Sequence, residues 1–156
     1  MKRQSIARFM FPARHSRAEE YALRIEQALP PKLQRLDVRA GLVEALTNAI
    51  LHGAFGIKRE TEDIEMYLDA IEEAEKQHAG TTVIGVTVMT SDDKADVTVN
   101  DFGQGFDWRR AMKRSGRGLS ILYEVFDSVH WNAGGNCVRL TIADAGAGND
   151  NKGSEE

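Results

Sequence analysis

The chain has 156 residues and a formal net charge of −4, a length that suits one domain with a single core. This mildly acidic net charge argues against a protein that binds nucleic acids in general or anionic membranes, because both activities need a basic surface. No apolar run approaches the length of a membrane span or of a signal peptide, and the single cysteine, Cys137, excludes an internal disulfide. We therefore expect a cytoplasmic protein.

The N-terminal part of the chain predicts a strand and a helix. Residues 4–11 alternate between polar and apolar side chains, which indicates a strand that Pro12 ends. Ser16 and Glu19 have the S-x-x-E spacing of a capping box, so we expect a helix to begin there. That helix should end at the Pro30-Pro31 pair.

A second helix is predicted over residues 37–53, and it carries a narrow polar stripe. On a wheel that advances 100° per residue, Glu44, Asn48, Gly41 and His52 fall within about 80° of one another, and the apolar residues occupy the opposite arc. The stripe has two interpretations. It faces solvent, or it forms a site in which Glu44 takes a proton and the Asn48 amide oxygen ligates a hard cation.

Residues 62–78 predict a third, amphipathic helix with an acidic surface. Its apolar stripe comprises Ile64, Tyr67, Leu68, Ile71 and Ala74. We favour the interpretation in which this stripe covers the edge of a sheet. The alternative is a docking surface, because the eight acidic residues between Glu60 and Glu75 would suit a basic partner.

The rest of the chain predicts two hairpins separated by a basic connection and a fourth helix. In order, the segments are strands at 81–89 and 94–101, the connection 102–118, a helix at 119–126, and strands at 127–133 and 137–143. This order predicts an α+β fold, a two-layer α/β sandwich with a mixed, mostly antiparallel sheet covered on one face by helices. We expect one domain over residues 1–143, with 58–79 as an inserted acidic helix and 144–156 as a disordered tail.

Glycine-rich stretches on either side of the basic connection add two candidate binding segments. Asp101 follows a strand, and Gly103 and Gly105 after it would let the backbone approach a ligand closely, although a plain turn has the same composition. Gly116 and Gly118 stand just before the fourth helix, whose first amides form a ready phosphate site. Five basic residues crowd the same connection: Arg109, Arg110, Lys113, Arg114 and Arg117. We therefore expect a polyphosphate ligand rather than a solvated basic loop.

Together, E-x-x-x-N on a helix, D-x-G-x-G after a strand and G-x-G before a helix resemble the Bergerat ATP-binding fold of gyrase, histidine-kinase and heat-shock-chaperone ATPases. Within that superfamily the chain resembles the bacterial anti-sigma-factor serine kinases over nearly its whole length. The segment EALTNAILHG looks much like their Asn-bearing helix. The acidic helix is a departure, since the connection at this point is usually shorter in the family.

The resemblance implies a role for each matching residue. Glu44 would be the catalytic base, and Asn48 would contact ATP and hold Mg²⁺. Asp101 would accept a hydrogen bond from the adenine amino group. The remaining implied ATP-binding residues are Gly103, Gly105, Arg114, Gly116, Arg117, Gly118 and Leu119. Because phosphoryl transfer depends mainly on positioning and charge neutralisation, these groups suffice without a covalent nucleophile.

The resemblance also implies a function and its partners. It predicts an ATP- and Mg²⁺-dependent serine/threonine protein kinase that phosphorylates an anti-anti-sigma (antagonist) protein, with a sigma factor as competing partner. It further implies a homodimer that contacts neither nucleic acid nor membrane directly. Two alternatives stay open at this point: a non-catalytic ATP-binding regulatory module, and an ATP hydrolase of the same fold.

Overall fold

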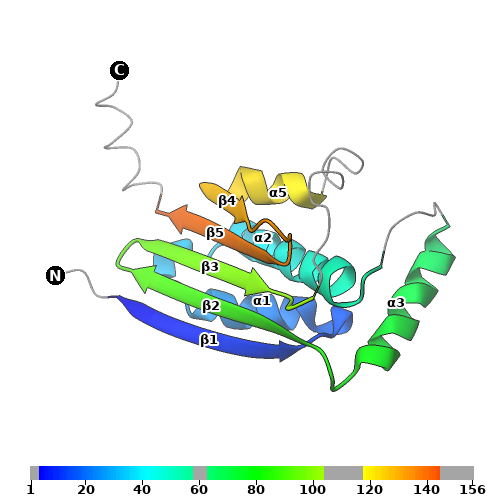
Figure 1. Ribbon diagram of the computed structural model, residues 1–156. Helices are drawn as coiled ribbons and strands as arrows, with labels where there is room; N and C mark the ends of the chain where they lie inside the picture. The colour runs from blue at the N-terminus through cyan, green and yellow to red at the C-terminus, as the bar shows by residue number, and fades with distance from the viewer. Residues whose placement is uncertain (1–3, 58–62, 104–117, 145–156) are drawn as a thin grey trace.

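The computed structural model describes residues 4–57, 63–103 and 118–144, which form a two-layer α+β sandwich (Figure 1). Its strands are β1 (Ser5–Pro12), β2 (Val83–Ser91), β3 (Lys94–Asn100), β4 (Ser128–Trp131) and β5 (Cys137–Ala143). They lie in the spatial order β1-β2-β3-β5-β4, and every pairing among these described strands is antiparallel. The predicted fold class is confirmed.

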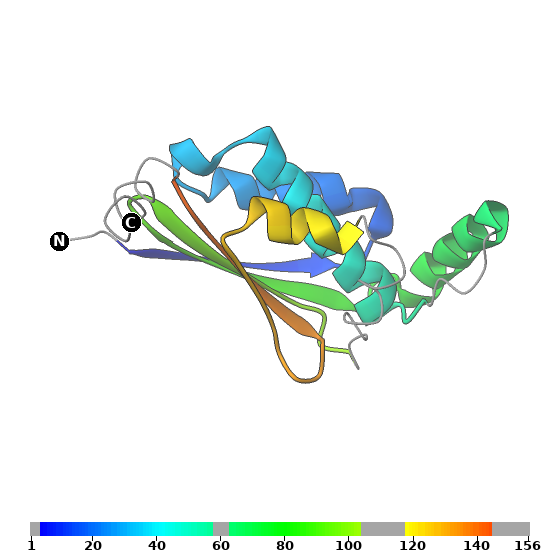
Figure 2. The same ribbon diagram turned by 90° about the horizontal axis from the view of Figure 1, so that it is seen from above.

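Three helices cover one face of this sheet (Figures 1 and 2): α1 (Ala18–Gln27), α2 (Leu36–Asn48) and α5 (Gly118–Val125). Short 3₁₀ turns, η1 (His15–Arg17) and η2 (Pro31–Leu33), precede α1 and α2. A wider π-helical segment, η3 (Ala49–Ala54), continues α2. Helix α3 (Ile64–His78) lies to one side of the sandwich in both views.

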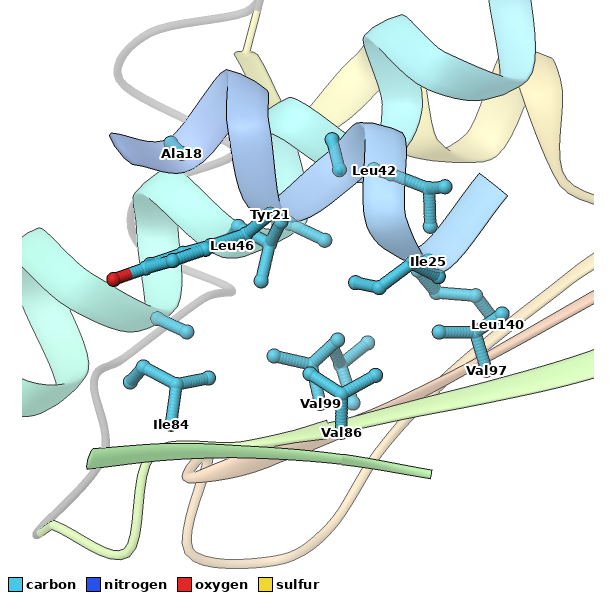
Figure 3. Packing of buried hydrophobic residues seen from close by; sticks show 14 of the residues in the cluster. Ala18, Tyr21, Ile25, Leu42, Leu46, Ile84, Val86, Val97, Val99 and Leu140 are labelled. Carbon is cyan, nitrogen blue, oxygen red and sulfur yellow. The ribbon is translucent and has the colours of Figure 1, made fainter. Parts of the chain in front are cut away.

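The core lies between the sheet and the three covering helices (Figure 3). Alternate residues of the central strands point to the helices, because successive side chains of a strand face opposite sides. Val86 pairs with Val99 and Val97 with Leu140, so these side chains share one face. From the helices, the buried residues in Figure 3 include Tyr21, Ile25, Leu42 and Leu46.

A close helix contact brings α5 against α2. A Cβ on Gly41 would stand 2.7 Å from the Phe126 ring, so only glycine allows this approach. Gly41 therefore belongs to the packing between helices, although the wheel placed it on the polar stripe of the second helix.

The predicted capping box at Ser16 and Glu19 is wrong. Helix α1 begins at Ala18, its N-cap residue is Arg17, and no side chain caps it. Ser16 lies in η1 instead, where its hydroxyl donates a hydrogen bond to Glu75 Oε1 of α3 at 3.1 Å. The long-range acceptor replaces the local one, so the serine links two elements rather than starting a helix.

The second helix does not run as a regular α-helix to Gly53. Beyond Asn48 its hydrogen bonds widen, and the Phe55 amide bonds to the Ile50 carbonyl five residues earlier. Such π-helical turns are rare and often occur at functional sites. The wheel drawn from the sequence therefore holds as far as Asn48 and fails for the residues after it.

The favoured interpretation of the acidic helix, a cover over the sheet edge, is also wrong. Helix α3 meets the body of the protein mainly through its C-terminal half: Ile71 is buried, the His78 ring stacks on Phe55, and His78 Nδ1 lies 3.2 Å from Thr82 Oγ1. Nearer the N-terminus, Tyr67 is half-buried and packs against the core. Ile64 and Leu68, farther along the same stripe, are exposed. The apolar stripe is therefore longer than the surface available to cover it.

In the described ranges no helix has both the length and the apolar character needed to cross a bilayer. The predicted tail, 144–156, lies outside those ranges apart from Asp144, whose amide donates to the Asp93 carbonyl at 2.8 Å. The domain limits predicted from the sequence stay predictions.

Candidate functional site

Glu44 and Asn48 form a hydrogen-bonded pair on α2. Asn48 Nδ2 donates to Glu44 Oε1 at 3.1 Å, one helical turn apart. Asn48 is only 8% exposed, while Glu44 is half-buried. The solvent-facing interpretation of the polar stripe therefore does not describe Asn48. Because its amide nitrogen is engaged by Glu44, its amide oxygen is directed away from that carboxylate.

Asp101 lies immediately beyond the end of β3 and is 3% exposed. Its Oδ1 accepts a hydrogen bond from the Gly103 amide at 2.7 Å, which closes a tight turn. Asn100 Oδ1 accepts from the Phe102 amide at 2.8 Å, and Phe102 takes a positive φ of 59°. Two successive side chains thus shape the backbone that follows the strand.

Gly53 of η3 brings the second helix into contact with this turn. A Cβ at Gly53 would stand 2.0 Å from Asp101 Oδ2, and a Cβ at Gly103 would stand 2.7 Å from the Gly53 carbonyl oxygen. Neither position has room for a side chain. The segment that follows Glu44 and Asn48 is therefore packed directly on Asp101, although the two lie far apart in sequence.

The β4–β5 turn holds the same loop from the other side. The Asp101 amide donates to the Asn136 carbonyl at 2.9 Å, and Asn136 Nδ2 donates to the Gly103 carbonyl at 3.0 Å. Asn132 Oδ1 in turn accepts from the Asn136 amide at 3.0 Å. Residues 101–103 are thus fixed at both ends.

A pocket of about 380 Å³ opens beside Asp101. It is lined by Met10, Ala54, Thr81, Thr82, Val83, Asp101, Phe102 and Gly103. These residues come from β1, η3, the start of β2 and the turn after β3, so the pocket lies where four parts of the chain meet. A mostly apolar wall with one buried carboxylate suits a flat ring that donates a hydrogen bond.

Burial raises the pKa of the Asp101 carboxyl, and the hydrogen bond from Gly103 offsets only part of this effect. Burial, together with the negative charge of Asp101, likewise raises the pKa of the Cys137 thiol. Cys137 pairs with Asn100 in the sheet. A cysteine with a raised pKa is a poor nucleophile, so we assign Cys137 no catalytic role.

The remaining predicted residues divide into two groups. Gly118 and Leu119 begin α5, and Leu119 is buried in the core, so only its backbone is available to a ligand. Gly105, Arg114, Gly116 and Arg117 lie outside the described residues. The structure thus brings Asp101 and Gly103 to the helix segment that follows Glu44 and Asn48, and it leaves the phosphate-binding half of the prediction undescribed.

His52 does not share the role of its neighbours on the predicted stripe. Its Nδ1 lies 2.7 Å from the carbonyl oxygen of Ile57, beyond the end of η3. A ring that binds a carbonyl at the end of a helix has a structural role, so we assign His52 to neither proton transfer nor metal binding.

The side chains present fit a magnesium ion that is held mainly by phosphates. Within the described residues, no three His, Cys, Asp or Glu side chains cluster as a metal site. Mg²⁺ commonly takes only one or two protein oxygens and completes its shell with phosphates and water. The Asn48 amide oxygen, oriented by the bond from Asn48 to Glu44, is a suitable ligand of this kind.

Two residues important to this geometry were missed by sequence reasoning. Gly53 was predicted only as the end of the second helix, and Asn136 lies between the strands predicted at 127–133 and 137–143. The H-G pair at 52–53 did mark a helix end, but nothing in the sequence indicated that Asp101 would occupy the space of the missing side chain. The contacts of Asn136 depend on a sheet register that its own neighbours do not reveal.

Comparison with known proteins bears on the whole arrangement. The family model described as histidine kinase-like ATPase domain matches residues 11–142, which include Glu44, Asn48 and Asp101 and every residue that lines the pocket except Met10. No protein of curated function matches the chain.

Proposed function

The chain belongs to the histidine kinase-like ATPase domain family, and from this premise we propose that it is an ATP- and Mg²⁺-dependent serine/threonine protein kinase. One observation carries the proposal. The helix segment that follows Glu44 and Asn48 packs through Gly53 onto the buried carboxylate of Asp101, beside a pocket. This packing supports our assignment of Glu44, Asn48 and Asp101 to one site, in which Asp101 recognises the base of the nucleotide.

Adenine recognition falls to Asp101. Its carboxylate accepts a hydrogen bond from the adenine amino group, and its rigid turn keeps it in place. Phe102, Thr82 and the other lining residues shape the pocket around the base. Because the carboxylate is buried, a bond to it is worth more than one in water.

Phosphoryl transfer falls to the pair on α2. Glu44, whose Oε1 already accepts the Asn48 amide, takes the proton from the attacking serine hydroxyl. Asn48 contributes its amide oxygen to Mg²⁺, which, when bound, neutralises charge on the phosphates. A base held in place by a neighbouring amide satisfies the positioning requirement of this chemistry.

The protein substrate follows from the resemblance to anti-sigma-factor kinases. We propose a serine on an anti-anti-sigma protein as the acceptor, with a sigma factor as the competing partner in the cytoplasm. Phosphorylation of the antagonist would break its complex and free this chain, acting as a homodimer, to hold the sigma factor. Direct contact with nucleic acid or membrane has no place in this scheme.

One incubation distinguishes this function from a hydrolase and from a non-catalytic module. The protein is mixed with radiolabelled ATP, Mg²⁺ and a purified candidate antagonist, and the label is followed. Phosphoserine on the antagonist supports the kinase. Free phosphate without a phosphoprotein indicates an ATP hydrolase, and nucleotide binding with neither product indicates a regulatory module. Absence of nucleotide binding would contradict all three.

A further inference from the structure

The apolar side chains along one face of helix α3 differ sharply in solvent exposure. On the helical wheel Ile64 and Leu68 lie within about 60° of Ile71, so the three share a face. Ile71 is 6% exposed where α3 meets the body, whereas Ile64 is 67% exposed and Leu68 is 55% exposed. The stripe therefore continues past the surface that covers its C-terminal half, and Figures 1 and 2 show α3 projecting from the sandwich.

The anchoring of α3 is concentrated in its C-terminal part, and Tyr67 is the residue nearest the N-terminus that packs against the core. Glu75 accepts the Ser16 hydroxyl, and the His78 ring stacks on Phe55 with its centroid 5.3 Å away. The N-terminal half has a good cap, since Asp63 Oδ1 accepts from the Glu65 and Met66 amides. A helix of 15 residues is nonetheless marginal without packing of its apolar face.

The acidic residues of α3 flank its exposed apolar stripe. With Ile71 as origin, Glu72 and Glu65 lie about 100° and 120° to one side, and Asp63 lies about 80° to the other. Six acids and one lysine occupy residues 63–78, and that lysine, Lys76, already pairs with Glu72 at 3.6 Å. The surface therefore combines apolar side chains with an excess of negative charge.

From these observations we propose that the N-terminal half of α3, through Ile64 and Leu68 (the α3 patch), docks a basic amphipathic helix of a partner protein. The spacing of Ile64, Leu68 and Ile71, at i, i+4 and i+7, is that of a helix–helix packing seam. Lysine or arginine flanks on the incoming helix would complement Glu65 and Glu72. Two copies of this chain are disfavoured as a pair through this patch, because acidic flanks would face acidic flanks.

The position of the α3 patch gives docking a consequence. Helix α3 leads directly into Thr81 and Thr82, which line the pocket beside Asp101, and His78 Nδ1 lies 3.2 Å from Thr82 Oγ1. A partner held on the N-terminal half of α3 would therefore lie about 15–20 Å along the helix from that pocket and would be connected to it through the C-terminal half of α3. The docking itself requires no nucleotide, so it is tested apart from the kinase function.

Fluorescence anisotropy with three synthetic peptides, each about 18 residues long, tests the docking in the absence of nucleotide. The first has a leucine stripe at helical spacing flanked by lysines. The second has the same stripe with glutamates, and the third has the composition of the first in scrambled order. We expect the intact chain to bind the first peptide most tightly. Ile64→Ser with Leu68→Ser should weaken that affinity roughly tenfold, since both substitutions remove central apolar contacts.

A matched control uses another exposed apolar pair. Ile6 and Met89 are cross-strand neighbours on the uncovered sheet face, and Ile6→Ser with Met89→Ser should leave the affinity unchanged. Circular dichroism verifies that both double variants stay folded. The proposal fails if the Ile64→Ser, Leu68→Ser variant keeps full affinity for the first peptide. It fails equally if the scrambled peptide binds as tightly as the first one, because binding would then depend on charge alone. It also fails if sedimentation shows wild-type self-association that the α3 substitutions abolish, because the occupant would then be a second copy.

Discussion

Helices α2 and α3 both contradict the expectation that polar residues face water and apolar residues face the core, but in opposite directions. Helix α2 buries Asn48, whereas α3 exposes Ile64 and Leu68. Burying an amide is unfavourable unless it is hydrogen-bonded, and exposing aliphatic side chains forfeits the main stabilising term of folding. The hydrogen bond to Glu44 offsets the cost of burying Asn48, whereas the exposure of Ile64 and Leu68 adds no stability. We propose nucleotide chemistry as the role of the first feature and partner binding as the role of the second.

Glu44→Gln gives the largest expected effect on the α2 side. It preserves the side-chain oxygen that accepts the Asn48 amide but removes the base, so phosphoryl transfer should fall about 10²- to 10⁴-fold. Nucleotide affinity, measured by calorimetry, should change little. Glu20→Gln, at an exposed position of α1, serves as the control and should retain full transfer. Phosphoryl transfer that persists in Glu44→Gln would show that Glu44 is not the catalytic base.

Two leucine substitutions test the contrast in burial directly. Leu46→Ala on α2 opens a cavity in the core and should lower the free energy of unfolding by about 2–5 kcal/mol. Leu68→Ala on α3 removes an exposed side chain and should change it by less than about 0.5 kcal/mol. Urea denaturation measures both. An equal loss of unfolding free energy in the two variants would show that Leu68 is covered in solution, and the proposed difference in burial between α2 and α3 would then be wrong.

Asp101→Asn should weaken ATP binding about tenfold to a hundredfold, the range for a hydrogen bond to a charged group.

The wild type should also lose stability as pH rises through the raised pKa of Asp101. Because that pKa exceeds the unfolded value, the folded chain holds the proton more tightly, and this stabilisation is complete only below the unfolded pKa. Thermal unfolding across pH 4–7 measures it, and the variant should have a flatter profile.

Asp96→Asn is the control for the dependence of stability on pH, because the pKa of Asp96 is shifted in the opposite direction from that of Asp101. Burial opposes ionisation of Asp96, but hydrogen bonds from Thr141 and Arg139 outweigh it and hold the pKa below its ordinary value. Its contribution to stability is therefore present above the ordinary carboxyl pKa and is lost as pH falls through the lowered one. ATP affinity should not respond to Asp96→Asn. If it does, the effect of Asp101 is not specific.

Gly53→Ala should produce the smallest of these effects on the site. The added methyl group would meet the Asp101 carboxylate, so the loop must shift, at a cost of about 1–3 kcal/mol in unfolding free energy. ATP affinity should fall in parallel. Gly134→Ala is the control, because its added Cβ would come no closer than 3.9 Å to another residue. Unchanged ATP affinity in Gly53→Ala would show that the contact of Gly53 with Asp101 does not influence the pocket.

Much of the fold was predictable from the sequence because local pattern and tertiary structure agree there. The alternation in 81–89 and 94–101 corresponds to β2 and β3, whose inward valines form part of the core. Ser16 was mispredicted because its real partner, Glu75, is remote in sequence. Helix α3 was predicted as an element, but its packing depended on how far the body extends, which no local pattern encodes.

The candidate site divides in the same way. Glu44 and Asn48 are one helical turn apart, so their shared face follows from the geometry of a single element. The contact of Gly53 with Asp101 could not be predicted, because it arises from an irregular turn and from a strand that ends in the right place. Asn136 reaches Gly103 only through the pairing of β5 with β3.

The π-helical turn at 49–54 has a consequence for comparing related chains. A relative that kept all six residues but wound them as an ordinary α-helix would have its later residues rotated out of phase, because each residue of a π-helical turn advances by a smaller angle than the 100° of an α-helix. A bulky side chain would then replace the glycine opposite the carboxylate, and the proposed adenine pocket would be lost although every motif survived in the alignment. A relative with one residue fewer and an ordinary α-helix would instead keep these later residues in phase, so the glycine could still face the carboxylate.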